Sequence, residues 1–243
     1  MTFTDLLDRT AELYLIVPLA AASLRKNNLP LPSCLVYWFL CSLSISYILR
    51  RVATLVLHNN IFFYHLFTVI ELFFISEVYY HLLPSRRIRL GIRSGQILFI
   101  PIAIGDATLS GRLVARLNTY ANTYAGTMLV ALSILHLFNL ADSLSKDLRT
   151  NPYFIFSIAT LLNSTLSTAI HTSSYFFDFS ENDLFYRMIE AFPFINALYI
   201  GLLTYMFSLF KLAVDPRNAL PWWLHFAAHR CVRPIMSQRT NLT

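Results

Sequence analysis

The fold is decided by residues 58–76, HNNIFFYHLFTVIELFFIS. This stretch opens with a polar turn and continues as an apolar segment to about Leu83, long enough to cross a bilayer because a membrane-spanning helix needs about 20 residues. Helical spacing places Tyr64, Thr68 and Glu71 on one face, since steps of four and seven residues nearly return to the same side of a helix. A carboxyl near the bilayer centre costs about 2.5 kcal/mol or more, so we expect Glu71 to face protein or water and to have a partner there.

The composition of the whole chain indicates a membrane protein. Of its 243 residues, 56% are hydrophobic and 13% are charged, and the mean hydropathy is +0.54. Soluble domains carry about 25% charged residues, so the chain is predicted to be embedded in a lipid bilayer. In a membrane protein, a net charge of +6 bears on the orientation of the helices, because basic residues gather in cytoplasmic loops. No nucleic-acid partner is therefore expected.

The apolar segments predict an all-α, polytopic domain of seven transmembrane helices over residues 1–214, followed by a basic interfacial tail over residues 215–243. A short apolar continuation is expected after the second helix, and a basic connector with four arginines is expected before the fourth. The fourth helix is short and contains Pro101, which favours a kink. The expected helices are about Asp8–Leu24, Ser33–Leu49, Ile61–Leu83, Ser94–Leu109, Thr119–Ala141, Pro152–Phe176 and Phe185–Val214.

Basic residues predict the orientation of these helices through the positive-inside rule. Most of the 19 Lys and Arg residues fall on the side that holds the first, third and fifth connections and the tail. The N-terminus is therefore expected outside and the C-terminus in the cytoplasm. An even number of helices would place both termini on one side and remove this bias.

Polar side chains from several predicted helices come to similar depths in the outer half of the membrane. On the sixth helix, Asn163 falls near the middle and His171 in the outer half. If such groups converge, they form a wet, outward-open cavity with Glu71 at its floor. The candidate ligand-binding residues are Tyr64, His65, Thr68, Glu71, Asn163, His171, Asn196 and Tyr199.

Structural interpretations of the same residues stay open at this point. Glu71 can be an acid that ties two helices together through a hydrogen bond to an Asn or Tyr of another helix. His65 can bond to a backbone carbonyl near the interface, and His171 is open to a similar structural reading.

Several chemistries are not indicated by the sequence. The lysines, Lys26, Lys146 and Lys211, all lie away from the middle of a predicted helix, which disfavours a retinal Schiff base. There is no P-loop and no GxSxG motif. The three cysteines have no metal-ligand spacing, and neither a cofactor nor a metal site is predicted.

Three segments resemble one family of proteins. These are residues 58–76, the start of the sixth helix NPYFIFS (151–157), and FINALY (194–199) of the seventh. They are similar to helices of poorly characterised seven-helix inner-membrane proteins of Bacteroidota, although Leu162 and Asn163 stand where an aromatic is more usual. The resemblance implies a bacterial inner membrane and, because such genes frequently lie near sensor-kinase genes, a signalling role. It implies no catalytic residues.

Three functions are compatible with these features. The first is a receptor-like or sensory protein that binds a small or lipidic ligand in its outer half and passes a conformational change to a cytoplasmic signalling partner. The second is a membrane-embedded enzyme that modifies lipids, with Glu71 and the histidines as acid/base groups or metal ligands. The third is a small proton-coupled transporter with Glu71 as the carrier. The first is preferred, and the chain is not assigned as an enzyme.

Overall fold

The computed structural model describes residues 14–108, 118–142, 148–176 and 183–212, which form seven α-helices, two short 3-10 turns and no strand within these ranges. The 3-10 turns are η1 (Lys26–Asn28) and η3 (Leu148–Thr150). The α-helices are α2 (Ile16–Ser23), α3 (Leu31–Leu57), α4 (Ile61–Leu82), α5 (Arg86–Thr108), α7 (Thr119–Asp142), α8 (Pro152–Phe176) and α9 (Asp183–Ser208).

Five of these helices are long and apolar enough to cross a membrane: α3, α4, α5, α7 and the Pro152–Ser173 part of α8. The apolar part of α9, Pro193–Ser208, is shorter, and α2 is described over only 8 residues. The chain is thus a helical, polytopic membrane protein, as its composition predicts. A count of seven spanning helices stays a prediction, and both the first residues of the expected first helix and the tail (215–243) lie outside the described residues.

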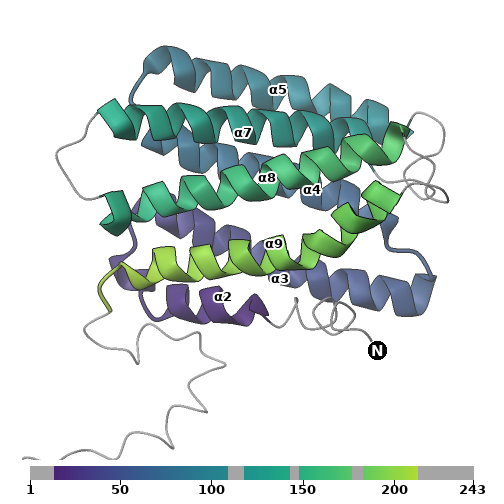
Figure 1. The fold of residues 1–243 in the computed structure, drawn as a ribbon, viewed down its shortest axis with the longest axis horizontal. Helices are drawn as coiled ribbons and strands as arrows, with labels where there is room; N and C mark the ends of the chain where they lie inside the picture. Colours follow the sequence, from purple (N-terminus) through teal and green to yellow (C-terminus); the bar gives the residue numbers. More distant parts are fainter. Residues whose placement is uncertain (1–13, 109–117, 143–147, 177–182, 213–243) are drawn as a thin grey trace, which may run out of the picture.

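Six helices form a closed ring in which each packs against two neighbours, in the order α2, α3, α4, α7, α8, α9 and back to α2. Helix α5 lies outside this ring and packs against α4 and α7, at the top of the view in Figure 1. We name the two ends of the ring after the residues that flank α4, as the Asn60 end and the Leu83 end.

Helix α3 joins two segments that the sequence suggested were separate. The expected Ser33–Leu49 helix and its apolar continuation form one helix of 27 residues. This helix stops at His58, whose φ of 51° lies in the left-handed region that ends helices. The side-chain oxygen of Asn59 then accepts a hydrogen bond from the Ile61 N–H at 2.9 Å, so the predicted polar turn between α3 and α4 is confirmed.

Helix α5 begins earlier than predicted, at Arg86 instead of Ser94. The expected basic connector is therefore wrong, because its arginines belong to the first turns of the helix. Contacts with α4 explain the early start: Arg93 Nη1 lies 2.7 Å from a carboxylate oxygen of Glu77, and Gln96 Nε2 donates to Ser76 Oγ at 2.8 Å.

Helix α9 ends earlier than predicted, at Ser208 instead of Val214. The carbonyls that follow it receive hydrogen bonds from the connection between α2 and α3. Arg25 Nε donates to the Phe210 carbonyl at 2.9 Å, and Asn28 Nδ2 donates to the Leu212 carbonyl at 2.8 Å. These side chains hold the chain just beyond the helix, whereas the Met206 and Phe207 carbonyls of α9 accept from the N–H groups of Leu209 and Phe210.

A close approach of α7 and α8 at Gly126 gives the first testable prediction. A Cβ at this position would collide with the Thr168 hydroxyl and lie 3.1 Å from the Thr168 Cβ. We therefore expect Gly126→Ala to lower the free energy of unfolding by about 1–3 kcal/mol, measured by thermal unfolding in detergent micelles. Gly201→Ala is the control, because nothing lies within 4 Å of its added Cβ. Equal effects of the two substitutions would contradict the prediction.

Candidate functional site

Glu71 lies in the middle of α4 and faces the interior of the ring. It shares its helix face with Ile75 and Val78, four and seven residues further on, whose exposed fractions are 1% and 0%. The exposed Phe62 and Leu66 lie on the opposite side of the helix. Glu71 itself is half-buried.

Tyr199 of α9 reaches the same region from the other side of the ring. It is buried, and its hydroxyl interacts electrostatically with both the Glu71 carboxyl and the Tyr79 hydroxyl. Asn196 precedes Tyr199 by three residues, which places it on the same face of α9 and about 4.5 Å nearer the Asn60 end. Asn196 is half-buried. The structure therefore brings together two of the predicted site residues, Glu71 and Tyr199, while Asn196 lies on the same side of α9 as Tyr199.

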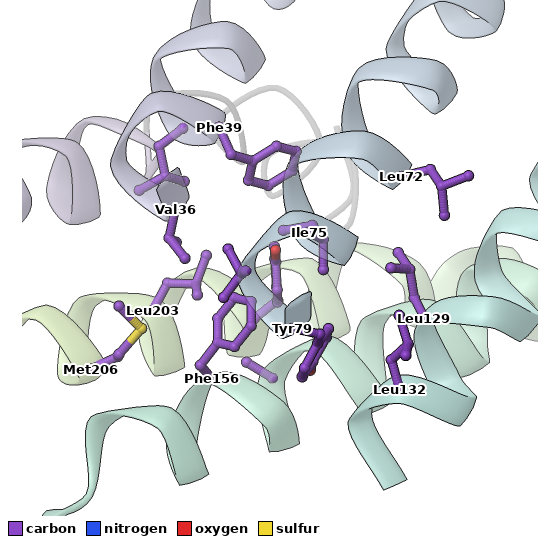
Figure 2. Packing of buried hydrophobic residues seen from close by; sticks show 14 of the residues in the cluster. Val36, Phe39, Leu72, Ile75, Tyr79, Leu129, Leu132, Phe156, Leu203 and Met206 are labelled. Atoms are coloured by element: carbon purple, nitrogen blue, oxygen red, sulfur yellow. The ribbon is translucent and has the colours of Figure 1, made fainter. Parts of the chain in front are cut away.

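The packing of the ring interior changes along its length. In the Leu83 half, large apolar side chains from α3, α4, α8 and α9 fill the interior, as the labelled Val36, Ile75, Tyr79, Phe156 and Leu203 in Figure 2 show. Toward the Asn60 end the buried side chains of α3, α4 and α8 are smaller or polar, as Ala53, Thr68 and Ser164 show.

Helix α8 shows this change along a single face. Thr160 and Ser164 are buried, with exposed fractions of 3% and 4%. Ser167 and His171 continue the same face toward the Asn60 end, at helical steps of three and four residues, and both are half-buried. Helical spacing therefore places His171 on the same side of α8 as Thr160 and Ser164. The described side chains of α8 thus change from buried near the Leu83 end to half-buried toward the Asn60 end.

Two predicted site residues turn away from this region. Thr68 lies toward α7, where its hydroxyl accepts a hydrogen bond from Asn118 Nδ2 at 2.6 Å and donates to the Tyr64 carbonyl at 3.0 Å. His65 is buried and lies about 120° around α4 from Glu71. The structure thus does not group Thr68 and His65 with Glu71.

The other two predicted residues have intermediate positions. Tyr64 is on the Glu71 face, and its ring packs under the Arg50 guanidinium of α3 at 4.9 Å. Asn163 is half-buried on α8, one residue before the buried Ser164 and nearer the Leu83 end than His171. Tyr64 therefore lies on the Glu71 side of α4 toward the Asn60 end, whereas no described contact relates Asn163 to Glu71.

The structure adds Asn122 of α7, which was not among the predicted site residues. Contacts between Asn118 and Thr68 and between Ser133 and Tyr79 fix the register of α7 against α4. By this register Asn122 lies at the depth of Glu71. Its side chain is buried, and its Nδ2 has no hydrogen-bond partner. The polar and aromatic run NTYANTY (118–124) was the available signal in the sequence, but hydropathy does not reveal which of its members faces the ring interior.

A second polar cluster lies in the Leu83 half and is internally satisfied. The Tyr79 hydroxyl lies 2.8 Å from Ser133 Oγ and 3.5 Å from Ser157 Oγ. His136 Nδ1 lies 2.7 Å from Ser157 Oγ. These buried groups link α4, α7 and α8 across the ring. Within the described part of the chain, no three His, Cys, Asp or Glu side chains are grouped as metal ligands would be.

The Tyr79 cluster gives the second testable prediction. Tyr79→Phe removes the hydroxyl that joins the three helices and leaves a buried serine short of a partner. We expect a loss of about 1–3 kcal/mol in the free energy of unfolding, measured in micelles. The matched control is Tyr80→Phe, because the Tyr80 ring is half-buried and packs on the Arg93 guanidinium. A smaller effect at Tyr79 than at Tyr80 would contradict the role assigned to the cluster.

Comparison with known proteins finds no family model, no curated protein and no solved structure that matches this chain. The resemblance to the Bacteroidota proteins therefore stays a prediction. Fold and composition together establish the coarser statement, that the chain is a helical, polytopic protein of a membrane.

Proposed function

We propose that this protein is receptor-like and binds a small or lipidic ligand inside the Asn60 half of its ring, with Glu71 at the floor of the site. The observation that carries the proposal is the change in packing along the interior. Large side chains fill the Leu83 half, whereas Glu71, Ser167 and His171 face the interior and remain half-buried. With the predicted orientation, this half faces the outside.

The polar groups around Glu71 define what the site would recognise. Glu71 offers carboxylate oxygens, Tyr199 a hydroxyl, and Asn196 and Asn122 offer amides that both donate and accept. Electrostatic interactions are strong where water is scarce. A ligand that places an N–H or O–H group against Glu71 is therefore favoured over a purely apolar molecule.

Helix α9 is the proposed route by which binding would reach a cytoplasmic signalling partner. Tyr199 and Leu203 lie on one face of α9, so a ligand that moves Tyr199 also moves the packed core of the Leu83 half. Arg25 holds the end of α9 to the first connection of the chain. The basic residues at this end, including those of α5, would present the change to the partner.

A proton-coupled transporter is the second candidate, favoured by one observation. Glu71 and Tyr79 both interact electrostatically with Tyr199, and Tyr79 continues to Ser157 and His136. Polar groups thus extend from the middle of the ring into its Leu83 half. Proton flux into liposomes that is lost in Glu71→Gln would favour the transporter over the receptor.

The third testable prediction concerns the Glu71 carboxyl. Native mass spectrometry of protein purified in mild detergent should detect a co-purifying small molecule or lipid. We expect Glu71→Gln to reduce its occupancy at least tenfold, because the change removes a charged acceptor worth roughly 1.5–3 kcal/mol. Glu77→Gln is the control, since Glu77 lies in an ion pair with Arg93 outside the ring interior.

Two outcomes would overturn the ligand-binding proposal. One is equal ligand occupancy in wild type and Glu71→Gln, with Glu77→Gln unchanged as well. The other is that Glu71→Gln lowers the yield of folded protein more than Glu77→Gln does, with no bound molecule in any sample. That result would make Glu71 a structural acid.

The fourth testable prediction concerns orientation. In a variant whose native cysteines are replaced by alanine, Asn60→Cys and Arg86→Cys place single thiols at opposite ends of α4 and its connection to α5. We expect a membrane-impermeant maleimide added to intact cells to label Asn60→Cys, and to label Arg86→Cys only after lysis. The reverse pattern would place the Asn60 end in the cytoplasm.

A further inference from the structure

Arg50 lies on α3 at the Asn60 end, in a setting made by aromatic rings. It is eleven residues beyond Phe39 and so shares its helix face, and the Phe39 ring packs 6.1 Å from that of Phe67 on α4. The Arg50 guanidinium lies 4.9 Å from the centre of the Tyr64 ring, 5.6 Å from that of Tyr47 and 5.9 Å from that of Phe67. These rings hold the cation in a fixed place.

The Arg50 cation has no acidic partner in the described part of the chain. The ion pairs found there both involve Glu77, with Arg93 and with His81. In addition, Nε of Arg50 is buried and has no hydrogen-bond acceptor. Burial of a charged donor without a partner is costly. An anion that accepted a hydrogen bond from Arg50 would offset this cost.

The position of Arg50 relative to Glu71 limits the shape of such a ligand. Arg50 packs on Tyr64, which lies seven residues before Glu71 on the same face of α4, or about 10 Å toward the Asn60 end. Glu71 would repel an anion at the floor of the site. An anionic ligand must therefore direct its charged group toward Arg50 and a neutral or cationic group toward Glu71.

We propose that Arg50 binds the anionic group, a carboxylate or a phosphate, of a ligand whose opposite end carries an N–H or O–H group for Glu71. The guanidinium suits this role because its planar set of donors can form two parallel hydrogen bonds with either anion. This inference rests on the proposed function and names the chemical class of the ligand. The anion comes from a water-soluble molecule or from a phospholipid headgroup.

Unfolding midpoints of the full chain, purified in non-ionic detergent and washed free of lipid, test the proposal. The soluble probe is inorganic phosphate, titrated at constant ionic strength against sodium chloride. The lipid probe is phosphatidylglycerol, added to nanodiscs of phosphatidylcholine. A ligand that binds the folded protein raises its midpoint. The variants are Arg50→Gln and Arg50→Lys, and the control is Arg51→Gln, because Arg51 is exposed and donates to the Tyr47 hydroxyl.

We expect phosphate to raise the midpoints of wild type and Arg51→Gln but not that of Arg50→Gln. Arg50→Lys should bind roughly tenfold more weakly, because an ammonium group lacks the paired donors. If only phosphatidylglycerol raises the midpoint, and only with Arg50 present, the anion is a headgroup. The proposal is overturned if neither probe shifts the wild type or if Arg50→Gln responds as wild type does. Should Arg50→Gln not fold, the comparison of Arg50→Lys with wild type decides.

Glu71→Gln in the same titrations separates this inference from the proposed function. If the response to anions depends on Arg50 but the co-purifying ligand is unaffected by Glu71→Gln, the anion site stands and the site at Glu71 fails. If Glu71→Gln loses the ligand and Arg50→Gln keeps both the ligand and the anion response, the proposed function stands and the role of Arg50 fails.

Discussion

Every polar group inside the bilayer must find its partner within the protein, because hydrocarbon offers neither donors nor acceptors. The helices meet this requirement for the backbone, and many hydroxyls meet it locally. Ser44 donates to the Leu40 carbonyl at 2.9 Å, and Thr204 donates to the Ile200 carbonyl at 2.8 Å. The polar groups that matter for the fold are those that act between helices, such as Tyr79 and Gln96, because each fixes the register of two or more helices.

The ring arrangement follows from the same requirement. Polar side chains placed on the inward faces of six helices can meet one another, whereas the outward faces are left to apolar residues such as Phe62 and Leu66. Satisfied groups collect in the Leu83 half, around Tyr79. Among the described residues, the buried polar side-chain atoms without a hydrogen-bond partner are Arg50 Nε of α3, Asn122 Nδ2 of α7 and the Thr160 and Thr168 hydroxyls of α8. Unused hydrogen-bonding capacity is therefore spread over three helices of the ring.

The sequence predicted the membrane class, the limits of α8 at Pro152–Phe176 and the inward face of Glu71, because all three follow from hydropathy and helical period. It could not give the order of helices around the ring. Thr68 is only about 60° around α4 from Glu71, yet this angle directs its side chain toward α7 and away from Glu71. The start of α5 and the end of α9 also escaped prediction, because hydropathy does not reveal the contacts that side chains from other segments, Glu77 and Arg25, make near them.

The hydrogen bond from Arg25 to the Phe210 carbonyl has a consequence for biogenesis. The two residues are 185 positions apart, and a ribosome that adds about 5–20 residues per second needs roughly 10–40 s to make that length. During this interval the part of the chain that contacts α2 and Arg25 in the folded protein, α9 and Phe210, is not yet complete. Assembly of the ring must therefore wait for insertion of α9, and α2 lacks its contacts with α9 for the whole of this interval.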